Sequence, residues 1–308
     1  MRDRATIARI RALAIPPAWT DVWIAADPKA HIQATGRDAR GRKQYRYHAE
    51  WHAAQDQAKY LRLAAFGAAL PSIRAHVRRD LGRADASRAQ VLALLVTLLE
   101  STYIRVGNRE YARTNRSYGL TTLEDRHVAV EGTRVHFAFR GKSGIRREIT
   151  LEDRTLARLI RQCRDIPGKH LFQYIDESGG RRPVHAGELN AYIADIVGGG
   201  FTAKDFRTWG GTLLAAEFLE QHDGDGEKPP GKKWLVRDVC SVSERLGNTP
   251  AVCRKSYVHP YLLEAYTDPR VWAAWRRTKV GRSRSGLSPS ESRLLRFLET
   301  AVRRRKAA

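Results

Sequence analysis

Tyr257, Arg105, Arg207 and Lys142 have the side chains that phosphodiester chemistry requires when no metal ion takes part. Such chemistry needs a nucleophile, cations that neutralise the charge developing on phosphorus, and an acid that protonates the departing oxygen. The sequence contains neither a Walker A glycine–lysine loop nor the clustered acids of a two-metal site. It is instead rich in arginine and lysine set into apolar segments, where a long cation is otherwise an unusual choice.

Most of these residues also have a purely structural explanation. Arg105 follows the apolar residues 94–104 and could interact with the carbonyl end of that helix. Lys142 lies at the tip of a predicted hairpin, where polar residues are common. Tyr257 is one of eleven tyrosines, and most tyrosines are packing residues. Arg207, in contrast, is predicted at the start of an amphipathic helix, where a cation is unfavourable unless an anion is near.

Two cations, Arg254 and Lys255, come just before Tyr257. A nearby cation favours the phenolate, which is the more nucleophilic form of a tyrosine. Spacing alone does not decide between this role and ordinary packing.

The net charge of the chain is its most unusual bulk property. Its 308 residues include 55 Lys and Arg against 33 Asp and Glu, a formal net charge of +22, and 42% of them are hydrophobic. A globular chain with this surplus predicts a polyanionic partner, either nucleic acid or an anionic membrane. The longest apolar run, residues 91–99, is too short to span a bilayer, and no signal-peptide core follows the N-terminus. We therefore expect a cytoplasmic, nucleoid-associated protein without membrane contact.

Metal ligands with a recognisable spacing are scarce. The three cysteines lie far apart without a CxxC motif, which indicates neither a disulfide framework nor a zinc site. His48 and His52 could pair on a metal, but a third ligand is not near them. The acids of residues 222–233 lack the sixth-position glycine and twelfth-position glutamate of a calcium loop. We expect no metal and no other cofactor.

The elements that would position the reactive residues fall into two parts. Residues 1–52 carry strand signals at 21–24, 31–35 and 44–48, with a hairpin-like turn at 36–41. This pattern predicts a small twisted sheet. From about Ala53 the periodicity of the apolar residues becomes helical.

The second part is predicted to be mainly helical, with a short antiparallel sheet inside it. Helical patterns cover residues 58–81, 88–104, 154–163, 186–197, 208–222 and 236–246, and strand patterns cover 128–130, 135–139 and 145–149. The fold class is therefore α+β, with an N-terminal β-sheet domain at residues 1–54 and a catalytic domain at 55–308. The last 39 residues hold twelve Lys or Arg against two acids, which predicts a solvated basic helical face and a basic tail.

Five ordered blocks, within residues 15–266, resemble the poxvirus and bacterial branch of the type IB DNA topoisomerases. Their number, length and order make coincidence negligible. The blocks are Gly36-Arg-Asp-Ala-Arg-Gly-Arg-Lys-Gln-Tyr-Arg-Tyr47, Arg105-Val-Gly-Asn-Arg-Glu-Tyr111 with Tyr118-Gly-Leu-Thr-Thr-Leu123, Phe139-Arg-Gly-Lys142, Lys204-Asp-Phe-Arg-Thr208, and Leu246-Gly-Asn-Thr-Pro250 with Ser256-Tyr257.

The resemblance implies an enzyme that relaxes supercoiled duplex DNA through a transient single-strand break. Tyr257 would attack a backbone phosphate to form a 3′-phosphotyrosyl bond, and Arg105 and Arg207 would stabilise the phosphorane. Lys142 would protonate the leaving 5′-oxygen, with Lys204 as a helper or a phosphate contact. Because the bond energy is kept in the phosphotyrosine, the resemblance implies that neither ATP nor a metal ion is needed.

One position departs from the poxvirus pattern. Poxvirus and eukaryotic members carry a histidine nine residues before the nucleophile, where this sequence has Asn248, as bacterial members commonly do. An amide is not a general acid, but it can donate a hydrogen bond to a non-bridging phosphate oxygen. We therefore assign Asn248 to the catalytic set as a hydrogen-bond donor.

The resemblance also implies a DNA-binding surface. Gln44, Tyr45 and Tyr47 occupy the DNA-contacting positions of the family, and Tyr111 is a plausible groove contact. Aromatic residues that alternate with cations fit duplex DNA, although ordinary strand alternation would also place them there. The two domains are expected to close around duplex DNA as a C-shaped clamp, with the protein working as a monomer.

Two other interpretations remain. Tyrosine recombinases share the catalytic domain, but they typically have histidine where this sequence has Lys204, and they lack the N-terminal sheet domain. A non-catalytic, architectural DNA-binding protein would explain the charge equally well. Charge does not separate these classes, whereas covalent chemistry does.

Overall fold

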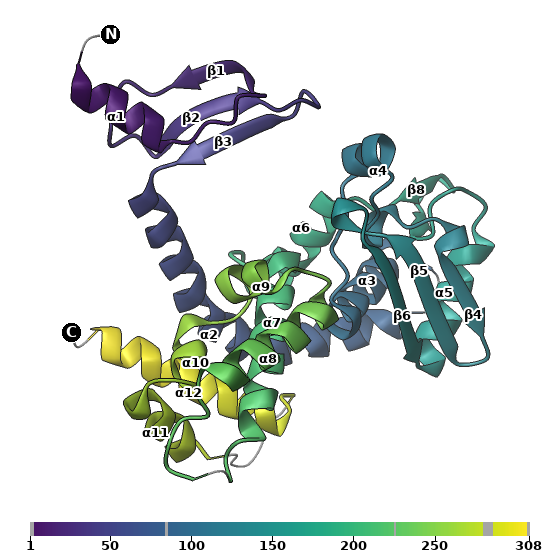
Figure 1. Cartoon of the computed structure of the whole chain (residues 1–308). Coiled ribbons are helices and arrows are strands. Elements are labelled where there is room, and N and C mark those ends of the chain that lie inside the picture. Colours follow the sequence, from purple (N-terminus) through teal and green to yellow (C-terminus); the bar gives the residue numbers. More distant parts are fainter. Residues whose placement is uncertain (1–2, 84–85, 225, 280–285, 307–308) are drawn as a thin grey trace. The chain divides into compact units, whose positions relative to one another are not determined.

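The computed structural model describes residues 3–83, 86–224, 226–279 and 286–306, and it divides into two compact units, Met1–Arg62 and Leu63–Ala308 (Figure 1). The units combine helices with small antiparallel sheets, which confirms the expected α+β class. Among the helices in these ranges, none combines the length and the apolar composition needed to cross a membrane.

The first unit contains a three-stranded antiparallel sheet. Strands β1 (Thr20–Ile24), β2 (Ile32–Arg37) and β3 (Lys43–Tyr47) lie in the order β1-β2-β3, so the three strands expected from the sequence are present. Asp38 closes the turn between β2 and β3 by accepting hydrogen bonds from the side chains of Arg42 (2.8 Å) and Gln44 (3.0 Å). The hydrogen bond from Arg42 lowers the pKa of Asp38 to about 2.

Helix α1 (Arg4–Ala12) is not predicted by the apolar periodicity, because none of its residues is buried. The Asp3 carboxylate begins the helix by accepting a hydrogen bond from the backbone N–H of Thr6 (2.9 Å). Arg9 attaches the helix to the sheet by donating to Gln33 Oε1 (2.6 Å) and to the carbonyl of Ala25 (2.8 Å). This helix is therefore held by polar contacts and not by an apolar face.

Helices α2 (Ala49–Leu81) and α3 (Arg88–Thr102) supply much of the core of the second unit. Helix α3 is buried along most of its length, as its Leu- and Val-rich sequence predicts, and it packs on α6 (Ala186–Val197) and α7 (Ala203–Glu220). Helix α2 begins earlier than the expected Ala53 and adds buried apolar residues from its second half. The other helices are α4 (Arg109–Asn115), α5 (Arg154–Asp165), α8 (Lys232–Leu246), α9 (Pro250–Ser256), α10 (Pro260–Glu264), α11 (Pro269–Arg277) and α12 (Pro289–Lys306).

A three-stranded sheet lies inside the second unit where the sequence predicts one. Strands β4 (Val128–Glu131), β5 (Arg134–Arg140) and β6 (Arg146–Glu152) pair in this order, and the one-turn helix η3 (Lys142–Gly144) forms the tip between β5 and β6. A separate hairpin consists of β7 (Gln173–Ile175) and β8 (Arg181–Pro183). Lys142 therefore lies at a hairpin tip, as expected.

The predicted start of α7 is wrong by five residues. The helix begins at Ala203 instead of Thr208, because Thr202 and Asp205 form a capping box in which the Thr202 N–H donates to Asp205 Oδ2 (2.8 Å). Arg207 consequently lies one turn inside the helix, where it is buried instead of standing at an exposed N-terminus.

The C-terminal segment is also more than a solvated basic face. Helix α12 buries Leu294, Leu295, Phe297 and Leu298, and its Arg293 is only 3% exposed. Arg293 forms an ion pair with Asp223, an acid from the loop whose composition resembles a calcium site. This helix is therefore part of the core through Ala301.

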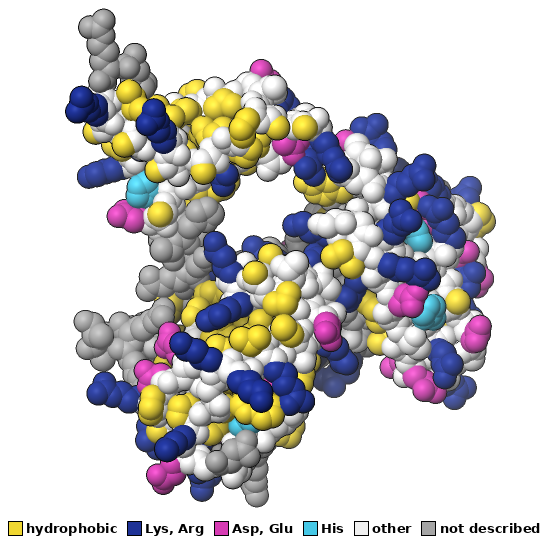
Figure 2. All heavy atoms as spheres, in the orientation of Figure 1, with side chains coloured by type: hydrophobic (Ala, Val, Ile, Leu, Met, Phe, Trp, Pro, Cys, Tyr) yellow, Lys and Arg dark blue, Asp and Glu magenta, His cyan; other side chains and the backbone are white. Residues whose placement is uncertain are grey.

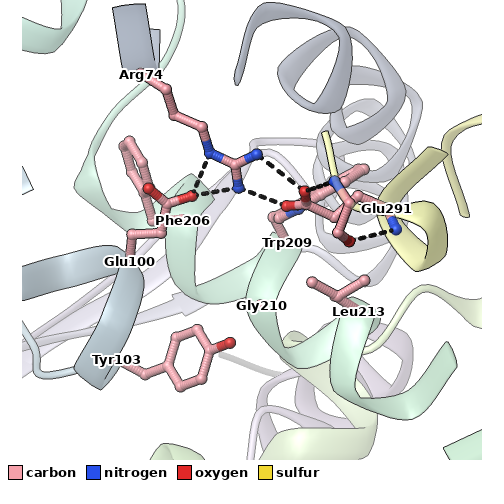
Figure 3. A pocket seen from close by; sticks show the side chains of 9 residues that line it. Arg74, Glu100, Tyr103, Phe206, Trp209, Gly210, Leu213 and Glu291 are labelled. Carbon is pink, nitrogen blue, oxygen red and sulfur yellow. Dashed lines mark hydrogen bonds and ion pairs between the residues drawn. The ribbon is translucent and has the colours of Figure 1, made fainter. Parts of the chain in front are cut away.

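A partly buried ion network, in which Glu291 is the buried member, connects α2, α3 and α12 beside α7. The guanidinium of Arg74 lies between the carboxylates of Glu100 (2.5 Å) and Glu291 (2.6 Å), next to a cavity of about 260 Å³ (Figure 3). Trp209 of α7 donates from Nε1 to Glu291 (3.3 Å). Burial favours the neutral form of Glu291, but Arg74 and the Ser288 N–H outweigh burial and lower its pKa.

We expect Arg74→Leu to lower the free energy of unfolding at neutral pH by about 3–5 kcal/mol, because it leaves the buried Glu291 carboxylate without its cation. Since the folded-state pKa of Glu291 is lowered, the ion pair stabilises the protein above the carboxylate's unfolded pKa and loses this effect in acid. Denaturant unfolding of both proteins at neutral and acidic pH measures the difference, which should narrow in acid.

Arg88→Leu is the matched control, because Arg88 pairs with Glu188 at the surface (3.0 Å) and should cost less than about 1 kcal/mol. Equal losses in the two variants would contradict a special role for the partly buried network.

Candidate active site

The carbonyl groups at the carboxyl end of α8 accept hydrogen bonds from three arginines of other segments. Arg207 of α7 donates from Nη2 to the carbonyl of Leu246 (2.9 Å), and Arg105 donates from Nη2 to the carbonyl of Gly247 (3.1 Å). Arg147 of β6 donates to the carbonyls of Glu244 (3.1 Å) and Arg245 (3.0 Å). Four consecutive carbonyls at the negative end of a helix dipole thus hold three guanidinium groups.

Arg105 acts as a helix-capping cation, but on a different helix from the one that the sequence suggests. It follows α3, whose last residue is Thr102, and its side chain reaches the end of α8 instead. Its backbone is fixed as well, since the Arg105 carbonyl accepts a hydrogen bond from the Leu120 N–H (2.8 Å). The structural and the catalytic explanations of this residue are therefore compatible.

Asn248 extends this arrangement by one residue. Its Oδ1 accepts a hydrogen bond from Arg105, while its Nδ2 is buried without an acceptor. The arginine donor fixes which amide atom is the oxygen, because a guanidinium has no acceptor to offer to an N–H. The amide N–H groups of Asn248 are thus left to donate to a further group.

Arg207 is 4% exposed, and its Nε and Nη1 have no hydrogen-bond acceptor. Its guanidinium carbon lies 5.1 Å from the centre of the Tyr257 ring. Burial, together with the charge of Arg105, lowers the pKa of Arg207 to about 10, so it is still a cation at neutral pH. A buried cation with unmet donors is costly unless an anion binds to it.

Tyr257 lies at the C-terminal end of α9, where its N–H donates to the carbonyl of Cys253 (2.9 Å). Its own carbonyl accepts a hydrogen bond from the Thr212 hydroxyl of α7 (3.1 Å). Burial favours the neutral phenol, but the charge of Arg207, supported by those of Arg105 and Lys204, outweighs burial and lowers the pKa of Tyr257. Arg207 and Arg105, which have the largest effect among these cations on the pKa of Tyr257, come from distant parts of the sequence.

Glycine in α7 allows Tyr257 to approach this helix closely. A Cβ on Gly211 would lie 2.9 Å from the carbonyl oxygen of Tyr257 and 3.2 Å from its Cβ. The neighbouring Gly210 similarly accommodates the ring of Tyr103. The helix that carries Arg207 can therefore contact the tyrosine segment with no side chain between the two backbones.

The two candidate lysines differ in their relation to this cluster. Lys204 is exposed in the first turn of α7, and its charge contributes to the lowered pKa of Tyr257. Lys142 is exposed at the hairpin tip, and among the described residues its ammonium forms no hydrogen bond or cation–π contact with Tyr257. The structure thus brings together Tyr257, both arginines and Asn248, but not Lys142.

Arg147 belongs to the cluster and is not predicted from the sequence. Burial and the charge of Arg105 lower its pKa. The sequence does not distinguish Arg147 from the arginine before it in the same alternating strand. Its contacts are to a helix almost one hundred residues later, which periodicity does not reveal. Only the tertiary structure reveals it.

The aromatic residues expected to contact DNA differ in exposure. Tyr45 is 43% exposed and Tyr111, on α4, is 48% exposed. Tyr47 is half-buried and stacks on Trp51 with ring centres 4.6 Å apart. Gln44 already donates to Asp38 in the turn. Tyr45 and Tyr111 are therefore the more accessible of the four.

The cluster is suited to binding an anion. Among the described residues, no carboxylate forms an ion pair with Arg105, Arg147 or Arg207, and no group of three His, Cys, Asp or Glu side chains could hold a metal ion. The side chain of His52 lies outside the described residues. Unmet N–H donors of Arg207 and Asn248 beside a phenol of lowered pKa can hold a phosphate against a nucleophile.

Comparison with known proteins gives matches to two family models. One, described as the catalytic core of eukaryotic DNA topoisomerase I, matches residues 48–277, and the other, described as the N-terminal domain of bacterial DNA topoisomerase IB, matches residues 1–38. DNA topoisomerase 1B of Acanthamoeba polyphaga mimivirus is 36% identical over 270 residues, which cover 85% of this chain and 80% of the viral protein.

More distant relatives match as well. DNA topoisomerase 1B of Vaccinia virus (strain Copenhagen) is 23% identical over 238 residues, 76% of this chain and 72% of the viral protein. DNA topoisomerase 1 beta of Arabidopsis thaliana is 26% identical over 178 residues, which are 56% of this chain and 18% of the plant protein.

We expect Arg207→Gln to raise the pKa of Tyr257, because it removes the largest opposing charge while the phenol stays buried. Ultraviolet titration of phenolate absorbance measures this when each protein is compared with its counterpart that also carries Tyr257→Phe. Arg254→Gln is the control, since Arg254 is exposed on α9 and should leave the titration unchanged. A Tyr257 pKa that does not respond to Arg207→Gln would contradict this electrostatic account.

Proposed function

The chain belongs to the type IB DNA topoisomerase family, and we propose that it relaxes supercoiled duplex DNA by breaking and resealing one strand through Tyr257. The reaction class is transesterification at phosphorus. DNA is the substrate class of the family.

In the cleavage step, Tyr257 Oη forms a bond to a backbone phosphorus while the bond from phosphorus to the 5′-oxygen breaks. The phenol proton passes to solvent, and the ammonium of Lys142 gives a proton to the departing 5′-oxygen. The products are a 3′-phosphotyrosyl bond and a free 5′-hydroxyl. After this strand rotates about its partner, the 5′-hydroxyl attacks the phosphotyrosine and restores the backbone without ATP.

The observation that carries this proposal is the buried guanidinium of Arg207, which has unmet donors and lies against the ring of Tyr257. Three arginines gather at one helix end, and no described carboxylate forms an ion pair with them, so an anionic ligand would complete their hydrogen bonds. A phosphorane gains more from these donors than the ground-state phosphodiester, because its equatorial oxygens carry more charge.

The roles of the remaining side chains follow from their chemistry. Asn248 would donate from Nδ2 to a non-bridging oxygen, since its Oδ1 is already used by Arg105. Lys204 is exposed, and its charge helps to lower the pKa of Tyr257. It would contact a phosphate next to the one that is cleaved. Lys142 would act as the acid from its hairpin tip once DNA is bound, because a catalytic hydrogen bond often forms only in the complex.

We further propose that residues 1–54 and 55–308 act as two jaws of a clamp around duplex DNA, with the protein working as a monomer in the cytoplasm. Tyr45 and Tyr111 would provide the main aromatic contacts, and Gln44 and Tyr47 would support or extend them. Lys and Arg side chains are spread over the visible face of the second unit and gather beside α4 and β8 (Figure 2), where Arg109, Arg113, Arg181 and Arg182 are exposed. Such a surface binds phosphates without reading sequence.

Supercoiled plasmid should be relaxed by this protein in the presence of EDTA and without ATP, because no step of the proposed chemistry uses a metal ion or a nucleotide. Tyr257→Phe should abolish relaxation and the covalent adduct trapped by SDS, while DNA binding measured by gel shift is retained. Relaxation by Tyr257→Phe would contradict the assignment, and binding without any adduct would leave an architectural DNA-binding protein.

We expect both Asn248→Ala and Asn248→Asp to slow single-turnover cleavage by about 10²-fold, the usual effect of losing one donor to a developing oxyanion. Asp should be at least as slow as Ala, because it keeps an acceptor for Arg105 but replaces the amide donor with a charge that repels phosphate. If Asn248 only positions Arg105, Asn248→Asp should cleave at nearly the normal rate.

A further inference from the structure

We propose that Arg147 is a positioning residue that holds the Lys142 hairpin against the carboxyl end of α8, so that proton transfer to the leaving oxygen depends on it. This inference rests on the proposed function, since it concerns the acid of that reaction. Arg147 is on β6, five residues after Lys142, and it is outside the set of residues that the sequence resemblance assigns to catalysis.

Arg147 connects β6 to α8 through two hydrogen bonds. Its Nη1 donates to the carbonyl of Glu244 (3.1 Å) and its Nη2 to the carbonyl of Arg245 (3.0 Å), in the last turn of α8. A guanidinium can form both bonds at once because its donors are fixed in one plane. Both acceptors carry partial negative charge at the helix C-terminus, which strengthens the bonds.

The end of α8 is shaped to receive this guanidinium. Gly247, the C-cap residue, adopts a left-handed backbone conformation (φ 60°), and a Cβ added to it would lie 2.3 Å from Arg147 Nη1. The absence of a side chain at Gly247 therefore leaves the space that the guanidinium occupies. The carbonyl of the same Gly247 accepts the hydrogen bond from Arg105. The hairpin that carries Lys142 and the arginines that would bind phosphate are therefore held by the same short segment, the carboxyl end of α8.

Backbone hydrogen bonds connect this anchor to the hairpin tip. Arg147 pairs in register with Phe139, and the Gly141 N–H donates to the carbonyl of Ile145 (2.8 Å) just below Lys142. The carbonyl of Arg140 also accepts a hydrogen bond from the Tyr118 N–H (2.7 Å). The backbone of Lys142 is therefore held at a fixed distance from α8, although its ammonium is exposed. Without Arg147, this end of the hairpin would lose two hydrogen bonds that connect it to α8.

A charge role for Arg147 predicts a different result from a positioning role. If its cation directly stabilised the phosphorane, its loss would slow cleavage whatever the leaving group. If it acts through Lys142, its loss should matter only when the leaving group needs a proton. A sulfur atom in place of the bridging 5′-oxygen departs as a thiolate and needs none, so it separates the two roles.

The test measures single-turnover cleavage on a duplex whose cleavage position has been mapped with the unsubstituted enzyme, with either oxygen or sulfur at the bridging 5′-position. Arg147→Ala should slow cleavage of the oxygen substrate by about 10- to 100-fold, because losing a positioning residue removes only part of the roughly 10²–10⁴-fold effect of a general acid. On the sulfur substrate it should cleave within about threefold of the unsubstituted rate, a result that also shows the variant is folded. Lys142→Ala should follow the same pattern.

The double variant Arg147→Ala/Lys142→Ala should be no slower on the oxygen substrate than Lys142→Ala alone, because the two residues serve one step. Arg146→Ala is the matched control. Arg146 is the preceding residue of β6, is 78% exposed in its side chain and pairs with Glu148 (2.6 Å), so its loss should leave both rates unchanged.

Equal slowing of Arg147→Ala on both substrates, a normal rate on the oxygen substrate, or additive losses in the double variant would each overturn the inference while the proposed function stands. A lack of covalent cleavage by the unsubstituted enzyme would instead overturn the proposed function and this inference with it.

Discussion

The carbonyl end of α8 is the feature on which the candidate site depends. Three arginines from different elements would repel one another if they met in an apolar environment, and no carboxylate among the described residues pairs with them. Backbone carbonyls solve this problem because they accept hydrogen bonds without neutralising the cations. A carboxylate would bind the guanidinium groups more strongly, but it would compete with a phosphate. The helix end therefore positions the positive charge and keeps it available.

The same arrangement governs the proposed nucleophile, Tyr257. A half-buried tyrosine such as Tyr257 would ordinarily titrate above its usual pKa, and burial acts in that direction here. The neighbouring cations reverse the outcome, and Arg207 can lie so near only because Gly211 brings α7 against the tyrosine backbone. A geometric constraint in a helix thus determines an electrostatic property of a side chain on another element.

The sequence predicts most of the fold where one face of an element is apolar. The strands β4 to β6, the buried α3 and the bounds of α6 follow from periodicity alone, whereas α1 is missed because its contacts are polar. Arg207 is predicted too near a helix start because the Thr202–Asp205 capping box lies upstream of the apolar pattern. Arg147 is missed because its role is a contact across nearly one hundred residues, and neither periodicity nor the family resemblance marks such a contact.

The unmet donors in this site have an energetic cost that the rest of the chain must offset. Each buried N–H without an acceptor costs on the order of 1–3 kcal/mol, and Arg207 and Asn248 both contribute such groups. The surrounding structure offsets this through elements with no part in the chemistry, including the packed α12 and the network of Arg74 with Glu100 and Glu291 beside α7. Because the donors are already held in place, a bound phosphate would not have to order them, and in the proposed reaction the free energy of forming those hydrogen bonds would be available to the transition state.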